Sequence, residues 1–371
     1  MLHIQQATTG CTGINDRIEG VFFLAIHTLQ FARHWCNLFG CLISIALRIT
    51  VLAINSSANT YQKVQAFAPA TMANMGIGFD IMGLAFQSLG DIVEVARHDE
   101  ADVVIVDIAG DGGKLPRDAH KNTATVAIMA YLKEIGCTDG FAVTIKKGLP
   151  LGSGLGSSAA SAVAGVVAVN ALLGSPLRKE DLLPACMEGE ALVSGYHADN
   201  IAPCLLGGLL LVDGITPDCV LRLPIYNGIH FALVTPNISV LTSEARSVLP
   251  QSISLKTMIK QTAGIARFMD ALHRGDWSAL ARAMEADEVI EPARAHLMPY
   301  LYELRQHAKA HGALGLVISG AGPTLCAICA SDDVAEKVAI AMSDFYRTNG
   351  LEAMSFATQI DTEGARVISA E

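Results

Sequence analysis

The sequence predicts an α+β fold with mostly antiparallel strands, divided into two domains. Segments with the period of a half-buried strand are mixed along the chain with apolar segments of helix length, and this mixture is typical of α+β proteins. The chain has 371 residues, 51% of them hydrophobic, which suffices for two domains with buried cores. A change of composition at residues 223–228 predicts the domain boundary.

Strand and helix patterns follow one another in both halves. Before the boundary, the predicted strands are 64–68, 91–96, 103–108, 141–147 and 207–212, and the predicted helices are 122–135, 157–173 and 179–194. After it, the predicted strands are 231–235, 315–318, 325–330 and 353–359, and the predicted helices are 255–273, 277–289, 298–311 and 333–346. We find no internal repeat and no low-complexity segment.

A glycine-rich segment, residues 150–161, joins the strand predicted at 141–147 to the helix predicted from residue 157. Gly152, Gly154 and Gly156 allow positive φ and a close approach of the backbone to a ligand. The free N–H groups and the positive dipole end of the following helix suit a polyphosphate. We therefore predict a phosphate site here and call residues 150–161 the phosphate loop.

Two familiar phosphate-binding patterns do not fit this loop. A Walker loop ends in Gly-Lys-Ser/Thr, whereas Gly156 is followed by Ser157 and Ser158. A dinucleotide fingerprint reads G-x-G-x-x-G, but the glycines here have the spacing G-x-G-x-G. A tight turn that only packs helix on strand explains one glycine but not the pair of serines.

Charge and cysteine content narrow the function classes. The formal net charge of −10 argues against a nucleic-acid partner. The nine cysteines are an odd number without framework spacing, which predicts reduced thiols and a cytoplasmic location. Cys326 and Cys329 form a C-x-x-C within an apolar run, and we predict core strand cysteines there rather than a metal or redox site.

The first 63 residues need a separate interpretation. Residues 21–54 are strongly apolar, but His27, Arg33 and Arg48 interrupt them before the length of a membrane span is reached. Acidic residues precede the apolar part, unlike in a signal peptide. We favour an extension created by a start codon assigned too far upstream, with the working chain beginning at 61–64. The alternative is a membrane-binding or partner-binding extension.

Three segments in order resemble one kinase family. The phosphate loop, the first motif (residues 68–80, Ala-Pro-Ala-Thr-Met-Ala-Asn-Met-Gly-Ile-Gly-Phe-Asp) and the third motif (residues 319–324, Ser-Gly-Ala-Gly-Pro-Thr) are similar to those of the kinases that include galactokinase, homoserine kinase, mevalonate kinase and phosphomevalonate kinase. Segments 197–203, 242–246, 291–294 and 361–367 resemble homoserine kinases most closely. The resemblance covers residue 64 to the C-terminus.

The resemblance implies a fold and a reaction. Its fold has the active site between an N-terminal α/β domain, here 64–224, and a C-terminal ferredoxin-like α+β domain, here 225–371, with 1–63 as an uncovered extension. The implied reaction is ATP-dependent phosphorylation of the hydroxyl of L-homoserine for threonine biosynthesis. A cytoplasmic homodimer is also implied, without a nucleic-acid or membrane partner.

The resemblance also implies roles for individual residues. Ser158 and Glu190 would hold Mg²⁺, whose preference is for hard oxygen ligands. For Glu190, an exposed helix carboxylate is the alternative. Asn122 would contact the nucleotide base, although a helix N-cap explains it equally well. The implied ATP-binding residues of the loop are Pro150, Leu151, Gly152, Ser153, Gly154, Leu155, Gly156, Ser157, Ser158, Ala159 and Ala160.

For the acceptor, the resemblance implies a site with both signs of charge. Asp80 would bind the ammonium group, and Arg246 and Arg294 would bind the carboxylate, which a guanidinium grips with two hydrogen bonds. Asn74 and Asn200 would orient the substrate. The expected catalytic residues are Asn200, Ser158, Glu190 and Arg246.

The proton acceptor and the acceptor substrate have alternatives. Asp199 is a candidate base, but we favour orientation of the hydroxyl by Asn200 and proton transfer to the phosphate itself. For His197, we expect a hydrogen-bonded loop residue rather than a base. Mevalonate or a sugar is an alternative acceptor, but Arg246 and Arg294 argue against it. A third hypothesis is a non-catalytic relative of these kinases, and the presence of Ser158 and Glu190 argues against that.

Overall fold

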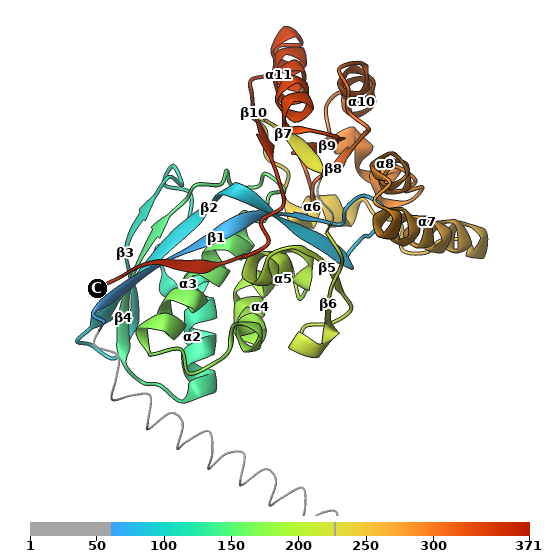
Figure 1. The fold of residues 1–371 in the computed structure, drawn as a ribbon. Helices are drawn as coiled ribbons and strands as arrows, with labels where there is room; N and C mark the ends of the chain where they lie inside the picture. The colour runs from blue at the N-terminus through green and yellow to red at the C-terminus, as the bar shows by residue number, and fades with distance from the viewer. Residues whose placement is uncertain (1–60, 226–227) are drawn as a thin grey trace, which may run out of the picture. The chain divides into compact units, whose positions relative to one another are not determined.

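The computed structural model describes residues 61–225 and 228–371, and these described residues belong to one compact unit. Apart from residues 61–63, the predicted extension and the hypothesis about its start lie outside the described residues. In the described part of the chain, no helix is long and apolar enough to cross a membrane. Two β-sheets with their helices make up this unit (Figure 1).

The first sheet has seven strands in the order β11-β1-β2-β4-β3, with β5 paired to β2 and β6 paired to β5. All pairings are antiparallel except that of β3 with β4. Because β11 pairs with β1, the end of the chain returns to the first sheet (Figure 1). The strands are β1 (Lys63–Ala73), β2 (Met82–His98), β3 (Val103–Ala109), β4 (Gly140–Lys146), β5 (Leu209–Val212), β6 (Val220–Arg222) and β11 (Arg366–Ala370).

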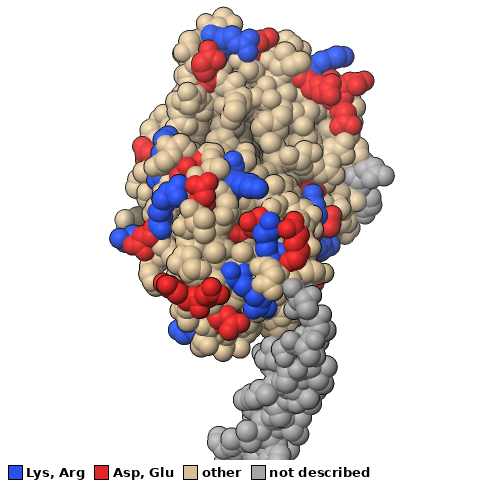
Figure 2. All heavy atoms as spheres, turned by 90° about the vertical axis from the view of Figure 1, so that its left-hand side faces the viewer, with Lys and Arg blue, Asp and Glu red and all other residues tan. Residues whose placement is uncertain are grey.

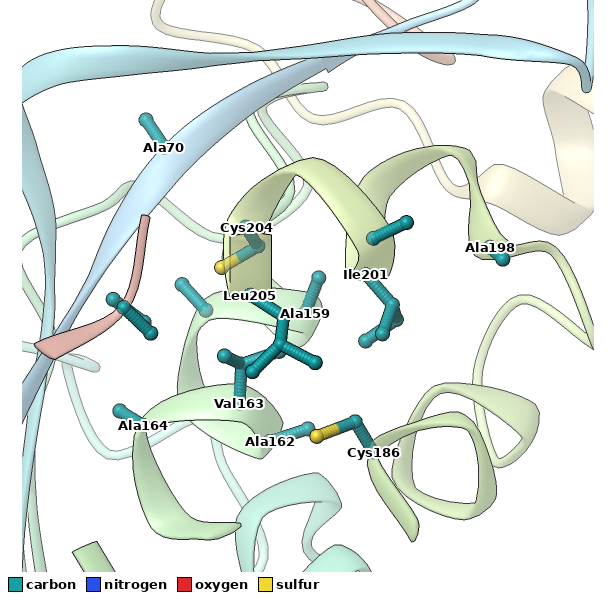
Figure 3. Packing of buried hydrophobic residues seen from close by; sticks show 14 of the residues in the cluster. Ala70, Ala159, Ala162, Val163, Ala164, Cys186, Ala198, Ile201, Cys204 and Leu205 are labelled. Carbon is teal, nitrogen blue, oxygen red and sulfur yellow. The ribbon is translucent and has the colours of Figure 1, made fainter. Parts of the chain in front are cut away.

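Four helices lie on one side of this sheet (Figure 1). They are α2 (Thr123–Ile135), α3 (Ser157–Leu172), α4 (Leu183–Ala191) and α5 (Ala198–Leu206). Every residue of α3 except Ser158 and Ala171 is buried, and its neighbours are β1, β2, α2, α4 and α5. Figure 3 shows the small side chains, Ala159 and Ala162 among them, that let these elements approach closely. This packing holds the start of α3, and with it the phosphate loop.

The second sheet has four antiparallel strands in the order β10-β7-β9-β8. This order, with helices after β7 and β9, is the ferredoxin-like arrangement that was expected. Cys326 and Cys329 are buried free thiols in β9, which confirms the prediction of core cysteines. The strands are β7 (His230–Pro236), β8 (Gly315–Ile318), β9 (Leu325–Cys329) and β10 (Ala353–Thr358).

The helices of this half connect or cover the second sheet (Figure 1). They are α6 (Thr242–Ser247), α7 (Leu255–Arg274), α8 (Trp277–Met284), α9 (Ile290–Arg294), α10 (Leu301–Ala310) and α11 (Asp332–Thr348). Tyr346 on α11 is fully buried, and its hydroxyl donates to the carbonyl of Pro299 at 3.1 Å. Short 3₁₀ helices in the described residues are Ala119–Lys121, Lys179–Leu182, Pro217–Cys219 and Ala295–Leu297.

The predicted α+β class is confirmed, but the ends of several elements differ from the prediction. The helix predicted at 277–289 ends at Met284, because the carboxylate of Asp287 accepts the N–H groups of Val289, Ile290 and Glu291 and starts a new helix. The helix predicted at 298–311 begins only at residue 301, after a tyrosine with φ of 60°. The helix predicted at 179–194 begins as a 3₁₀ turn and ends at 191.

Other elements were predicted only in part or not at all. The strand predicted at 91–96 is only the second half of β2, because Gly83 and Gly90 interrupt its apolar alternation. A Cβ at these positions would overlap the carbonyl oxygens of Asp199 and Ala68, respectively. Helix α5 was missed because Pro203 lies inside it. Helices α6 and α9 and strands β6 and β11 are too short for a clear period.

We expect Gly189→Ala to lower the free energy of unfolding by about 1–3 kcal/mol, because overpacking outweighs the gain in helix propensity. The new Cβ would overlap the carbonyl oxygen of Thr123 and lie 3.0 Å from the Cβ atoms of Ala127 and Ala162. Urea unfolding of the two proteins measures the difference. Gly165→Ala is the control: its nearest neighbour is the end of the Ile128 side chain at 3.1 Å, so its effect is smaller. Equal stability of wild type and Gly189→Ala would contradict the prediction.

Candidate active site

One cavity of about 400 Å³ collects the segments that the sequence singled out. Its lining comes from the first motif, the phosphate loop, α4, α5, the segment 240–246, Arg294 and the third motif. These segments are far apart in the chain, and both halves of the described unit contribute to the cavity. A cavity of this size and mixed polarity is the form expected of a small-molecule site.

The phosphate loop enters α3 through Gly156, whose φ is 65°. Gly152 and Gly154 also have positive φ, at 62° and 78°, which confirms the expected use of glycine. Among the residues that the structure describes, no side chain caps the start of α3. A bound anion can therefore accept hydrogen bonds from the N–H groups of the first turn.

The glycines of the loop also allow the three motifs to touch. A Cβ on Gly154 would overlap the carbonyl oxygen of Ser319, and one on Gly156 would overlap the hydroxyl of Thr71. The hydroxyl of Ser319 donates to the carbonyl of Gly154 at 2.8 Å. Close packing between segments of the same chain is thus a second reason for glycine at these positions.

Further hydrogen bonds tie the loop to its neighbours. The N–H of Thr71 donates to the carbonyl of Leu155 at 3.0 Å, and the N–H of Thr324 donates to the carbonyl of Ser153 at 3.1 Å. The hydroxyl of Thr71 donates to Oδ1 of Asn200 at 2.8 Å. This last bond fixes the orientation of the Asn200 amide in the cavity wall.

Glu190 is a buried carboxylate, 2% exposed, on the wall of the cavity. Burial raises its pKa to about 7, against the lowering effect of hydrogen bonds from Ser158 and Ser194. Its Oε2 atom has no hydrogen-bond partner among the described residues. A buried carboxylate oxygen without a partner, beside a serine hydroxyl, suits a hard cation such as Mg²⁺. Most ligands of such a cation are water molecules and phosphate oxygens, so few protein ligands are needed. Glu190 is therefore not the exposed helix carboxylate that the sequence analysis gave as the alternative.

Asp80 and Arg246 form an ion pair inside the cavity. Nη1 and Nη2 of Arg246 donate to the two carboxylate oxygens of Asp80 at 3.1 and 2.8 Å, and Nδ1 of His197 lies 3.5 Å from the same carboxylate. Asp80 has a φ of 60°, and its N–H donates to Oδ1 of Asn74 at 3.0 Å. The two expected substrate contacts of opposite charge thus pair with each other, while Nε of Arg246 has no hydrogen-bond partner among the described residues.

Arg294 is 3% exposed and held by backbone carbonyls. Its Nε donates to Ala245 at 3.0 Å and its Nη1 donates to Gly320 at 3.1 Å. Its guanidinium lies 5.2 Å from the ring centre of Phe79, which Arg246 also approaches, at 5.6 Å. Burial, together with the neighbouring Arg246, lowers the pKa of Arg294 to about 10. Two guanidinium groups on one ring create a positive corner in the cavity.

Asp199 and His197 lie at the start of α5 and line the cavity. Burial, and then the carboxylates of Asp80 and Glu190, raise the pKa of Asp199 to about 7. Burial lowers the pKa of His197. His197 is the N-cap residue of α5 but makes no side-chain cap bond there, and its role as a loop residue rather than a base stays a prediction.

Some of the expected ATP-binding residues lie outside the cavity lining. These are Pro150, Leu155, Ala159, Ala160 and Asn122. Leu155, Ala159 and Ala160 are buried core residues. Asn122 caps α2, with its Oδ1 accepting from the N–H of Ala124 at 3.1 Å, so the local explanation for this residue is confirmed. Its contact with a base stays a prediction.

The sequence analysis missed a lysine in the wall. Lys147 follows β4, lines the cavity and pairs with the buried Asp91 of β2. Its position just before a glycine-rich loop could have predicted this place in the wall, because basic residues are common at sites that bind phosphate. No pattern in the sequence connects it to Asp91, which lies on another strand.

The charges outside the cavity do not form a basic patch on the face that Figure 2 shows. Lysines and arginines alternate there with aspartates and glutamates. Several exposed charges of the described residues are paired, such as Arg97 with Asp139 and Arg117 with Asp107. Arg246 and Arg294 are therefore distinguished by their place in the cavity rather than by a general positive field.

Asp199→Asn is expected to change how stability depends on pH. Folded Asp199 keeps its proton up to about pH 7, whereas an unfolded aspartate loses it near 3.8. The folded state therefore binds more protons between these values, and this residue's contribution to stability is lost as pH rises through that window. Relative to wild type, the variant gains roughly 1–3 kcal/mol between pH 5 and pH 8, measurable by urea unfolding at both values. The exposed Asp344→Asn is the control, and a parallel pH dependence of wild type and Asp199→Asn would refute the prediction.

The comparisons with known proteins agree with this geometry. Family models for the GHMP kinases N terminal domain and the GHMP kinases C terminal domain match residues 122–208 and 268–348. Homoserine kinase of Chloroherpeton thalassium is 39% identical over 319 residues, which cover 83% of this chain and 100% of that protein. Homoserine kinase of Xylella fastidiosa is 36% identical over 315 residues, which cover 85% of this chain and 97% of that protein.

Solved structures give the same relationship. The crystal structure of homoserine kinase from Cytophaga hutchinsonii matches with a TM-score of 0.79 and 39% identity, covering 83% of this chain and 98% of that one. L. major mevalonate kinase, in complex with R-mevalonate, matches with a TM-score of 0.63 and 17% identity, covering 82% and 99%, and shares the fold. Because the chain covers nearly the whole length of homoserine kinases that are 36–39% identical to it, it belongs to the homoserine kinase family of the GHMP kinases.

Proposed function

We propose that this protein transfers the γ-phosphoryl group of ATP to the hydroxyl of L-homoserine, making O-phospho-L-homoserine for threonine biosynthesis. One observation carries the proposal: a single cavity joins the uncapped start of α3 to an aspartate and two arginines. The first feature suits the phosphates of a nucleotide. The second suits a small zwitterion that carries an ammonium and a carboxylate group.

For ATP, the proposal assigns the phosphates to the loop and to the first turn of α3. Of the residues expected from sequence, those that line the cavity are Leu151, Gly152, Ser153, Gly154, Gly156, Ser157 and Ser158. Their contribution is through backbone N–H groups and the helix dipole, which are already oriented before the nucleotide binds. Asn122, next to Thr123 in the wall, is the proposed contact to the base.

Ser158 and Glu190 are the proposed ligands of Mg²⁺. The partnerless oxygen of Glu190 and the neighbouring serine support this assignment. A bound Mg²⁺ neutralises charge on the transferring phosphoryl group. Because only two protein ligands are required, the absence of any group of three or more His, Cys, Asp or Glu suited to a metal among the described residues is compatible with it.

Homoserine is proposed to bind by exchanging partners with the Asp80–Arg246 pair. Its ammonium takes the place of the guanidinium beside Asp80, and its carboxylate takes the place of Asp80 beside Arg246 and Arg294. A ligand with only one of the two charges would leave one member of the pair without a partner in a partly buried site. The exchange therefore favours an amino acid over mevalonate or a sugar.

Asn200 and Asn74 are the proposed orienting groups for the substrate. Asn74 donates through Nδ2 to the carbonyl of Gly320 at 3.0 Å, so it links the first and third motifs beside Asp80. For the proton, we retain transfer to the phosphate with Asn200 orienting the hydroxyl. Asp199 is the alternative acceptor, and its pKa of about 7 makes it chemically competent. Asp199→Asn distinguishes the two, because retained turnover excludes a required base.

Other parts of the proposal concern the whole protein. We place the boundary between its two domains at residues 224/225, with β11 returning to the sheet of the first. We propose a homodimer in the cytoplasm, on the strength of the family alone.

The proposed reaction is tested by ADP formation with purified protein, Mg²⁺ and ATP. L-homoserine, mevalonate, galactose and no acceptor are compared side by side. Turnover confined to L-homoserine is expected, since it alone carries both charges that the site matches. Turnover with another alcohol, or none from a folded protein that binds ATP, would overturn the assignment of substrate.

Arg246→Lys is expected to raise the KM for L-homoserine by about tenfold or more, while the KM for ATP changes little, because a lysine cannot grip a carboxylate with two parallel bonds. Steady-state kinetics with each substrate varied in turn gives both values. Arg267→Lys, an exposed arginine of α7, is the control. An equal rise in both KM values would argue against a specific contact with the substrate carboxylate.

Glu190→Gln is expected to reduce kcat by about a hundredfold or more, because a neutral amide is a poor ligand for Mg²⁺. The exposed Glu188→Gln, two residues earlier on the same helix, is the control and should leave kcat unchanged. Near-normal turnover of Glu190→Gln at all Mg²⁺ concentrations would remove Glu190 from the metal site.

A further inference from the structure

A buried carboxylate lies beneath the phosphate loop. Asp91 of β2 is fully buried, and its Oδ1 accepts the N–H groups of Gly148 and Leu149 at 3.0 and 3.2 Å. Its Oδ2 accepts from the hydroxyl of Ser161 at 2.8 Å and from the ammonium of Lys147. Gly148 and Leu149 lead into the loop, and Ser161, its last residue, already lies in α3. One side chain therefore holds both ends of the loop.

Lys147 completes the connection. Its side chain is 1% exposed, and besides Asp91 it donates to the carbonyl of Ser157 at 2.7 Å and to the hydroxyl of Ser161 at 2.8 Å. Its three N–H groups thus all have acceptors. Although Lys147 also lines the cavity, these contacts make its ammonium a support for the first turn of α3. The hydroxyl of Ser157 closes the loop further by donating to the carbonyl of Leu149 at 3.4 Å.

Stability alone does not account for this arrangement. A buried ion pair is often no more stabilising than apolar residues of the same volume. In addition, a lysine at the start of a helix opposes the helix dipole. Unlike apolar side chains, the charged pair makes directional hydrogen bonds. Each of these bonds fixes the orientation of a specific backbone or hydroxyl group at the ends of the loop.

We propose that Asp91, Lys147 and Ser161 form a positioning network that holds the loop's N–H groups in the geometry that binds phosphates. None of the three residues needs to contact the nucleotide. They act through Gly148, Leu149 and Ser157, whose positions determine where the intervening loop and the first turn of α3 lie. The inference rests on the proposed function, because it assumes that the loop binds the phosphates of ATP.

The test compares ADP with adenosine, which lacks the phosphates. The variant is Asp91→Asn/Lys147→Met, which removes both charges together and so avoids leaving one of them buried and unpaired. Calorimetric titration of wild type and variant with each ligand gives four affinities. We expect ADP to bind about tenfold or more weakly to the variant, as small misplacements of a preorganised site can cost that much. Adenosine should bind as before. Lys146→Met, the exposed neighbour, is the control.

Each outcome has a distinct meaning. An unchanged ADP affinity in the folded double variant, or an equal loss for both ligands, would overturn the positioning role. If wild type itself binds ADP no better than adenosine, the proposed function fails and the inference fails with it. Should the double variant not fold, Ser161→Ala removes one hydroxyl of the network and leaves the charges in place. Weaker binding of ADP with unchanged binding of adenosine in that variant would support the proposal. Unchanged ADP affinity would refute it.

Discussion

The absence of side chains at Gly154 and Gly156 is the constraint on which the site depends. At these two positions the phosphate loop lies against Ser319 of the third motif and Thr71 of the first, at distances that leave no room for a Cβ. The two β-sheets meet the start of α3 through these contacts. The cavity is shaped where the three motifs touch, so the same contacts that join the halves of the described unit also shape the proposed nucleotide site.

Charge is arranged in that cavity against the overall sign of the protein. The chain carries a formal net charge of −10, and Asp80, Glu190 and Asp199 add three carboxyl groups to the wall. Two of these have pKa values raised to about 7 by burial. Positive potential comes from the helix start and from Arg246 and Arg294 around Phe79. A nucleotide, a cation and a zwitterion would together carry charges that complement those of the cavity wall.

The sequence was informative where the pattern is local. The glycine spacing and the serine pair predicted an uncapped helix start with positive φ, which the structure contains. The periodicity predicted most strands and long helices. It failed at β2, whose glycines are required by neighbours on other elements, and at α5, where Pro203 argued against a helix. It also could not separate Asn122 as a cap from Asn122 as a ligand, since both uses require the same residue at a helix start.

The sequence by itself determined the fold class, the phosphate loop and the residue types available for the reaction, because these follow from periods of two and 3.6 and from the chemistry of adjacent residues. Tertiary structure alone decided which of these residues meet. It paired Asp80 with Arg246, left one oxygen of Glu190 without a hydrogen-bond partner in the described part of the chain and placed Lys147 on Asp91 under the loop. Such contacts join residues far apart in the chain, and their energies depend on burial, which no local pattern encodes.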